Sequence, residues 1–192
     1  MKWGLIVEGQ GDERAAPIVL RRIIGHFAPT RVVGAIEPLR VSRGKLVKEP
    51  ELKRAVELVS RRVGPAGPLI ILFDADDDCP ATLAPKLLSW ACEARADRPI
   101  AVILAMREFE AWFLGAAASL RDVRGLPADL APPPNPEGIR GAKQWLGRQM
   151  PDGYSETLEQ VELARKFDLD VARAACPSFD KLVRDVLRLL GA

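Results

Sequence analysis

Residues 69–78 read LIILFDADDD, and this stretch decides the class of fold. Its unbroken apolar run predicts a strand that is buried on both faces, because a half-exposed strand would alternate apolar and polar side chains. Similar runs occur at residues 3–7 (WGLIV) and 100–105 (IAVILA), and a weaker one at residues 31–41. Strands of this kind lie in parallel sheets with helices on both sides. We therefore expect an α/β fold with a parallel sheet in three layers.

Helical patterns separate the expected strands. Apolar side chains recur at helical spacing from Asp12 to about Gly25, after Pro50, and from about Pro80 to Ala96. Asp12 is expected to cap the first of these helices, since a carboxylate at the N-cap accepts an unpaired backbone N–H. Strands and helices that alternate in this way predict parallel strands joined by helical crossovers.

The second half of the chain differs in character from the first. Residues 126–141 (LPADLAPPPNPEGIRG) are rich in proline and glycine and predict a loop. Only helical patterns follow, and the strongest apolar stripe spans residues 179–190. We expect an α/β core over residues 1–125, followed by this loop and by a helical extension, residues 142–192, that packs on the core.

The composition of the 192-residue chain excludes several classes of protein. Hydrophobic residues make up 48% and charged residues 28%, which is typical of one globular domain. No apolar run approaches the roughly 18 residues that cross a bilayer, and the run at residues 3–7 is too short for a secretory signal, so no membrane association is expected. Three cysteines without a CxxC pair and a single histidine exclude a disulfide framework and most zinc hydrolases, and they favour a cytoplasmic location.

Charge is unevenly distributed along the chain. Residues 31–63 hold nine lysines and arginines against four acids, whereas residues 64–138 hold six against eleven. This pattern fits a track for a polyanion beside a cation site, and it also fits solvated faces of different sign. The sequence shows no strongly basic surface, so tight binding to DNA by the chain alone is not expected.

Carboxylates follow two of the expected strands at the point where each strand ends. Glu8 follows the strand at residues 3–7, and Asp74 and Asp76 follow the strand at residues 69–73. The carboxyl ends of parallel strands meet at one edge of a sheet, so these side chains converge if the two strands are neighbours. Oxygen ligands without a nearby His or Cys suit Mg²⁺ or Mn²⁺. Each acid taken alone is also explained as a solvated turn residue or a helix cap.

Several other motifs are excluded by their spacing. Residues 9–11 (GQG) lack the third glycine of a dinucleotide fingerprint, because Arg14 stands there, and no GKS or GKT follows. An EF-hand loop is excluded because Cys79 and Pro85 replace its glycine and its final glutamate. A phosphatase of the haloacid dehalogenase type also has a strand followed by DxD, but that interpretation leaves Glu8 unexplained.

Four segments resemble known protein families. They are VEGQGDE, FDADDD, REFEAWFL and CPSFDKL, at residues 7–13, 73–78, 107–114 and 176–182. The first two resemble the Toprim domain of topoisomerases, primases and OLD-type nucleases, in which a strand-end glutamate and a DxD pair surround Mg²⁺ and act on phosphodiester bonds. All four together are similar to an uncharacterised bacterial Toprim-like family, domain of unknown function 4276.

The Toprim resemblance implies roles for individual acids. Glu8 is implied to be a general acid/base or a metal ligand, Asp74 and Asp76 to hold Mg²⁺, and Asp12 to serve a second metal ion. The chain departs from topoisomerases at one point, because its only tyrosine, Tyr154, lies in the C-terminal part. Topoisomerase activity of this chain is therefore not expected.

Glu110 is a further candidate metal ligand. Residues 107–114 follow the fourth expected strand, so Glu108 or Glu110 can reach the same edge of the sheet, but two positions apart on a helix they cannot both face it. The family resemblance favours Glu110, and the alternative is an acid that stabilises the N-terminus of a helix. The neighbouring Trp112 and Phe113 are expected in the core rather than stacked on bases.

Three basic residues are candidates to contact a phosphate group. Arg43 and Lys45, in VSRGKLVK, are candidate substrate-binding residues. Lys143, in RGAKQW, is a candidate catalytic residue that neutralises charge developing on the substrate. The alternative for each of them is an exposed surface cation.

These features together predict a Mg²⁺- or Mn²⁺-dependent protein that transfers phosphoryl groups or cleaves phosphodiester bonds, with nucleic acid as the substrate that the resemblance favours. Two alternatives stay open, a non-catalytic Toprim-like module that acts through a partner protein and a DxD phosphatase. Analogy with the family also implies a role in bacterial defence against phage or mobile DNA.

Overall fold

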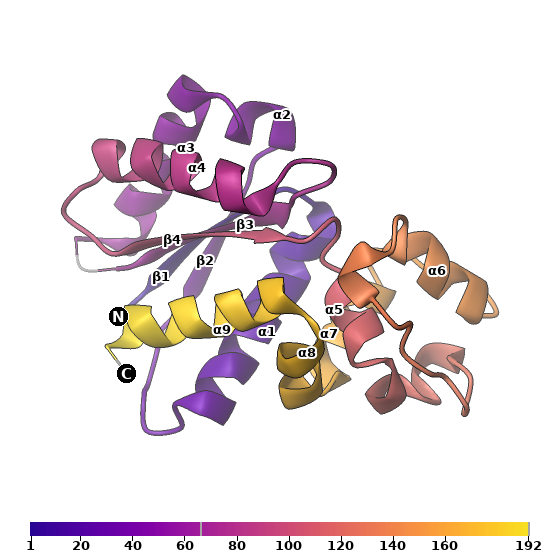
Figure 1. Ribbon diagram of the computed structural model, residues 1–192. Helices are drawn as coiled ribbons and strands as arrows, with labels where there is room; N and C mark the ends of the chain where they lie inside the picture. The colour runs from indigo at the N-terminus through magenta and orange to yellow at the C-terminus, as the bar shows by residue number, and fades with distance from the viewer. Residues whose placement is uncertain (66, 192) are drawn as a thin grey trace.

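A computed structural model describes residues 1–65 and 67–191 of the chain. At its centre is a parallel sheet of four strands in the order β2-β1-β3-β4 (Figure 1). The strands are β1 (Trp3–Val7), β2 (Ile36–Arg40), β3 (Leu69–Asp74) and β4 (Ile100–Ala105). Helices cover both faces of this sheet, so the predicted α/β fold with three layers is confirmed.

Helices follow each strand and make up most of the C-terminal half. In chain order the α-helices are α1 (Gln10–Phe27), α2 (Arg43–Leu46), α3 (Glu49–Val63), α4 (Pro80–Ala94), α5 (Ala111–Gly115), α6 (Ala142–Gln149), α7 (Glu159–Lys166), α8 (Leu169–Ala175) and α9 (Pro177–Leu190). Short 3₁₀ turns lie at Ala117–Leu120, Val123–Gly125 and Pro136–Gly138, the last of them inside the proline-rich loop. None of the described helices is both long enough and apolar enough to cross a membrane.

The two faces of the sheet belong to separate hydrophobic cores. Helices α3 and α4 lie on one face, and α1 and α9 lie on the other (Figure 1). Successive residues of β1 alternate between the two cores, so Leu5 and Val7 pack on the α1 side and Ile6 packs on the α3 side. Because both faces are covered, every residue of β1 is buried, which explains why this segment has no polar side chain.

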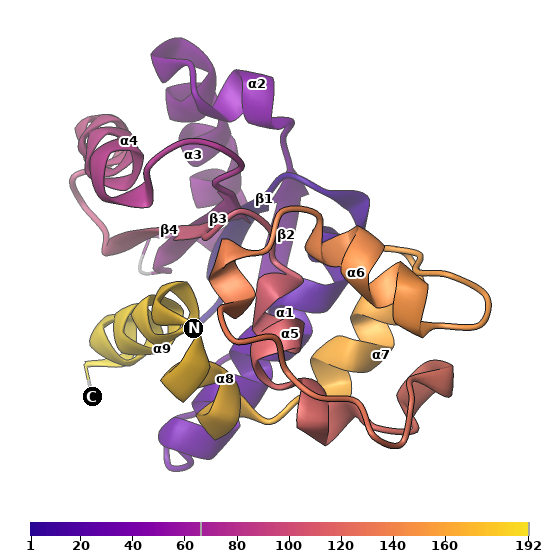
Figure 2. The same cartoon turned by 45° about the vertical axis from the view of Figure 1, so that its right-hand side comes forward.

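The C-terminal half enlarges the core on the α1 side. Helices α5 to α8 pack there beside α1 (Figure 2). Trp112, Phe113, Phe167 and Phe179 are fully buried and contact one another in pairs, with ring centroids 5.2–5.5 Å apart. The expected placement of Trp112 and Phe113 in the core is therefore confirmed.

At both edges of the sheet, some of the outward-facing backbone hydrogen-bonding groups are either bound by side chains or absent. At the β4 edge, α9 supplies two cations: Lys181 Nζ donates to the carbonyl oxygen of Val102 (3.1 Å), and Arg188 donates to that of Ile100 (3.2 Å). At the other edge, β2 contains Pro38, which has no backbone N–H. Proline is tolerated in a strand at an edge because one side of that strand has no partner.

Three local predictions differ from the structure. The weak strand expected at residues 31–41 is shorter and begins at Ile36. The residues before it are mostly exposed to solvent and do not pair with β1 as a strand. Asp12 is not the N-cap of α1: Gly9 occupies that position, and its backbone N–H donates to Asp12 Oδ2 (3.0 Å). The short helix at residues 43–46 was not expected, since four residues are too few to show a helical period.

The order of the strands defines where a ligand site is favoured. The chain passes from β1 to β2 through α1 on one face of the sheet, and then returns through α3 on the other face to β3, which lies on the opposite side of β1. In open parallel sheets a crevice forms at the carboxyl ends of the two strands where the direction of winding reverses. Here those strands are β1 and β3.

Candidate functional site

Carboxylates lie at the carboxyl ends of β1 and β3, as the sequence predicts. The two strands are neighbours, with Val7 paired to Leu72, so Glu8 and Asp74 lie at the same edge of the sheet. Asp76 follows β3 by two residues, and the first turn of α1 brings Asp12 to the same edge. The condition for these acids to converge, that the two strands are neighbours, is therefore met.

Five carboxylates are close enough for their charges to act on one another, and we call them the acid cluster: Glu8, Asp12, Asp74, Asp76 and Glu110. The charges of Asp76 and Asp12 raise the pKa of Glu8, after the larger effect of its partial burial. Burial, followed by the charges of Glu110 and Asp12, raises the pKa of Asp74 well above its ordinary value. Asp12 therefore acts on Glu8, Asp74 and Glu110, and Asp76 acts on Glu8.

Asp74 and Glu110 form the buried part of the acid cluster. The side chain of Asp74 is 15% exposed, and its Oδ1 accepts the backbone N–H of Phe109 (2.8 Å). Glu110 precedes α5 and is fully buried, and its Oε1 accepts the hydroxyl of Tyr154 (2.8 Å). The other oxygen of Glu110, Oε2, is buried without a hydrogen-bond partner among the described residues. A buried carboxylate oxygen that accepts no hydrogen bond is costly unless a cation or a proton compensates its charge.

Lys143 lies between these carboxylates. Its Nζ is 2.9 Å from Glu156 Oε1, 3.7 Å from Asp74 Oδ2 and 4.0 Å from Glu110 Oε2. These acids raise the pKa of Lys143 above its ordinary value although burial lowers it, so the ammonium group keeps its charge. The structure therefore brings this predicted catalytic residue into the acid cluster, where one cation faces several carboxylates.

Asp12 is fixed by the contact between α1 and α7. Its Oδ1 accepts the side-chain N–H of Gln160 (2.8 Å), and its Oδ2 accepts the backbone N–H of Gly9. Gly11 permits this contact, because a Cβ atom at that position would lie 1.9 Å from Gln160 Oε1. Burial raises the pKa of Asp12, and the hydrogen bonds from Gln160 and Gly9 lower it.

Arg43 and Lys45, the predicted substrate-binding residues, differ in their surroundings. Arg43 Nε donates to Asp76 Oδ2 (2.7 Å), and a second nitrogen of its guanidinium group contacts Asp78. Arg43 therefore borders the acid cluster on the Asp76 side. The side chain of Lys45 is exposed and forms no hydrogen bond or ion pair with the part of the chain that the structure describes.

The donor set of the acid cluster fits a hard divalent cation. Carboxylate oxygens are the ligands that Mg²⁺ and Mn²⁺ prefer, and Glu110 Oε2 is a buried oxygen that accepts no hydrogen bond within residues 1–65 and 67–191. In their present positions, no three His, Cys, Asp or Glu side chains among residues 1–65 and 67–191 are arranged to hold a metal ion. The ammonium group of Lys143 lies within 4.0 Å of Asp74, Glu110 and Glu156. A metal ion held by both Asp74 and Glu110 would have to displace this ammonium group.

Burial of Glu110 predicts a measurable dependence of stability on pH. Burial raises the pKa of Glu110 from 4.5 to about 7, so between these values the folded protein binds a proton that the unfolded chain releases. This contribution to the free energy of unfolding is complete below pH 4.5 and is lost as the pH rises through 7, and it amounts to about 3 kcal/mol. Glu110→Gln should remove it, so the variant gains stability relative to the wild type between pH 4.5 and 7.5. Urea unfolding across this range measures the difference, and parallel curves for the two proteins would contradict the prediction.

Sequence reasoning did not identify three side chains that complete the site. Glu156 binds Lys143, Gln160 binds Asp12, and Tyr154 donates to Glu110. All three lie in the helical C-terminal half, far along the chain from the acids that they contact. No sequence spacing connects them with β1 or β3. The only available indication was that they are polar residues in the helical C-terminal half.

Comparison with known proteins gives one match. The family model described as Domain of unknown function (DUF4276) matches residues 7–187. No curated protein and no solved structure matches the chain.

Proposed function

The chain belongs to the family described as Domain of unknown function (DUF4276), and from the site that it carries we propose that it is a Toprim-like protein that binds Mg²⁺ or Mn²⁺ and cleaves phosphodiester bonds in nucleic acid. The observation that carries this proposal is the acid cluster at the ends of β1 and β3, in which a buried oxygen of Glu110 accepts no hydrogen bond from the described residues. The order of its acids, a glutamate after the first strand and a DxD pair after β3, supports the Toprim affiliation. The same affiliation is the basis for proposing a bacterial protein that acts on foreign DNA.

Each acid of the cluster has a distinct proposed task. Asp74, Asp12 and Glu110 are the most buried, and they would hold the cation together with Asp76. A bound divalent cation stabilises negative charge on phosphoryl oxygens and lowers the pKa of a coordinated water. Glu8 is partly exposed and its pKa is raised, so it can accept a proton from the attacking water and transfer it to solvent.

Lys143 is the proposed electrostatic catalyst. If Asp74 and Glu110 held a cation, Lys143 would stay attached to α6, and its long side chain could direct the ammonium group toward the substrate. A cation beside the phosphoryl oxygens stabilises the charge that develops in the transition state.

A second candidate function is a non-catalytic module that acts through a partner protein. The observation that favours it is the position of Lys143, which already compensates part of the charge of the acid cluster. A site that is permanently closed by this lysine would bind no metal ion. Stabilisation of the protein by Mg²⁺ or Mn²⁺ therefore distinguishes the two functions.

The proposal is tested by cleavage assays with Glu8→Gln. The wild type should cleave at least one member of a panel of single-stranded DNA, duplex DNA and RNA in Mg²⁺ or Mn²⁺, and EDTA should abolish the activity. Glu8→Gln should lower kcat by about 10²–10⁴-fold, because it removes the group that accepts the proton. Glu13→Gln, a matched change one residue beyond Asp12, should retain activity.

Two outcomes would contradict the nuclease proposal, and a third would contradict only the role of Glu8. No cleavage of the panel, together with no thermal stabilisation by either metal ion, favours the non-catalytic module. Turnover of small phosphate esters that is indifferent to Glu8→Gln favours the DxD phosphatase. Full activity of Glu8→Gln on nucleic acid removes the proposed role of Glu8.

A further inference from the structure

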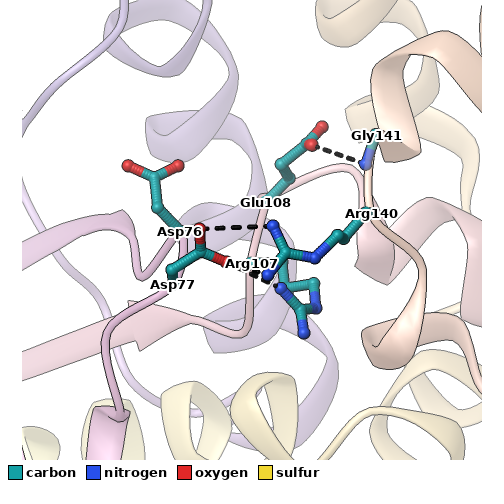
Figure 3. A pocket seen from close by; sticks show the side chains of 6 residues that line it. All are labelled: Asp76, Asp77, Arg107, Glu108, Arg140 and Gly141. Atoms are coloured by element: carbon teal, nitrogen blue, oxygen red, sulfur yellow. Dashed lines mark hydrogen bonds and ion pairs between the residues drawn. The ribbon is translucent and has the colours of Figure 1, made fainter.

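A small pocket beside the acid cluster carries two arginines in its wall (Figure 3). It has a volume of about 130 Å³ and is lined by Asp76, Asp77, Arg107, Glu108, Arg140 and Gly141. These residues come from the loops that follow β3 and β4 and from the segment that precedes α6. Asp76 belongs both to this pocket and to the acid cluster, so the two sites adjoin.

The two arginines converge on the carboxylate of Asp77. Arg107 donates to Asp77 Oδ1 (3.2 Å), and Arg140 contacts both oxygens, at 3.2 Å and 2.5 Å. Figure 3 shows both guanidinium groups on the same side of the Asp77 carboxylate. The side chains of Asp77 and Arg140 are 68% and 70% exposed, so separating them exposes little new charge to solvent and costs little.

Arg107 has a hydrogen-bond donor that Asp77 does not bind. Its Nε is buried without a hydrogen-bond partner among the described residues. Its backbone has a positive φ of 63°, and its carbonyl oxygen accepts the N–H of Asp76, whose φ is 50°. Two non-glycine residues in this region of the Ramachandran plot are strained, and strain of this kind is concentrated at functional sites.

The other acids of the pocket are already occupied. Glu108 accepts the backbone N–H groups of Gly141 and Lys143, both at 3.1 Å, and Asp76 accepts from Arg43. Asp77 is therefore the acid that neutralises the two arginines. A phosphate group offers more acceptor oxygens than one carboxylate, and paired guanidinium groups match its geometry.

We propose that Arg107 and Arg140 form a subsite for a phosphate group of the substrate, and that Asp77 occupies the two arginines until that phosphate replaces it. The identification of this phosphate as part of a nucleic-acid backbone rests on the proposed function. The subsite then holds a phosphate that neighbours the one at the acid cluster, and it orients the strand for cleavage.

The proposal is tested by isothermal titration calorimetry, in which inorganic phosphate is titrated into the metal-free protein. Asp77→Asn should bind phosphate about tenfold more tightly than the wild type, because the competing charge is removed. Asp77→Asn with Arg140→Gln should lose this gain, and Asp129→Asn, an exposed acid in the proline-rich loop, should match the wild type. Arg140 is largely exposed, so its variant is expected to fold. Equal affinity of Asp77→Asn and the wild type, or tight binding that survives the loss of Arg140, would overturn the subsite.

A second measurement separates this proposal from the nuclease proposal. With an oligonucleotide that the wild type cleaves, Arg140→Gln should raise KM about tenfold and leave kcat nearly unchanged. Metal-dependent cleavage with an unchanged KM overturns the subsite while the nuclease stands. Tight phosphate binding by Asp77→Asn without any cleavage retains the anion subsite and removes the nuclease.

Discussion

Asp74→Asn is expected to abolish metal-dependent activity and to make the metal-free protein more stable. The change keeps the oxygen that accepts the N–H of Phe109, but it removes a buried charge that faces Glu110 and Asp12. Loss of a central ligand should lower cleavage by about 10³-fold or more. Relief of repulsion between buried carboxylates should raise the free energy of unfolding by about 1–2 kcal/mol, which corresponds to a Tm about 3–6 °C higher.

The sign of the stability change is the informative part of this prediction. If a residue serves packing, its substitution destabilises the protein. If a buried charge serves to bind a ligand, its removal stabilises the ligand-free protein. Thermal unfolding in EDTA and in Mg²⁺ measures both effects, and Asp129→Asn serves as the control. If Asp74→Asn melts at a lower temperature in EDTA, or still gains stability from Mg²⁺, then Asp74 is not a metal ligand of the proposed kind.

Lys143→Met is expected to shift the metal-free stability in the opposite direction. Without the ammonium group, Asp74, Glu110 and Glu156 lose the cation that they surround. Removing one partner of a buried ion pair leaves an uncompensated charge, and at this partly exposed site the cost should be about 2 kcal/mol in EDTA. Mg²⁺ or Mn²⁺ should restore this stability, so the thermal shift caused by the metal ion is larger in Lys143→Met than in the wild type.

Activity and stability should separate in this variant. Cleavage by Lys143→Met should fall by about 10²-fold even when the metal ion is saturating, because the charge beside the phosphoryl oxygens is missing. Lys48→Met, at an exposed lysine before α3, controls for the loss of a positive charge. A metal-induced shift no larger than that of the wild type would show that Lys143 and the cation do not compete for the same carboxylates.

Much of the fold followed from apolar runs in the sequence. The segments at residues 3–7, 69–73 and 100–105 form strands where they were expected, because a strand covered on both faces has no polar position to obscure its pattern. The ends of the strand at residues 36–40 were predicted poorly, because this strand lies at an edge of the sheet and mixes apolar and polar residues. Membership of the domain of unknown function 4276, suggested by the four quoted segments, is confirmed by the match over residues 7–187, and the Toprim affiliation stays a proposal.

The placement of the candidate site was predictable only in part. Glu8, Asp74 and Asp76 follow strands, so the topology of a parallel sheet was enough to bring them together. The position of Lys143 depends on how residues 126–141 cross the end of the sheet, and no local pattern encodes that path. The contacts of Tyr154 and Gln160 depend on the packing of α7 against α1, which is a property of tertiary structure.

The protection of both sheet edges affects the tendency of the protein to aggregate at high concentration. An unprotected edge recruits strands from other molecules and leads to aggregation or fibre growth. Here Lys181 and Arg188 bind carbonyl oxygens of β4, and Pro38 interrupts the hydrogen-bonding row of β2. Self-assembly through a continuous intermolecular sheet is therefore suppressed at both ends, and a chain that loses α9 would become prone to polymerise through β4.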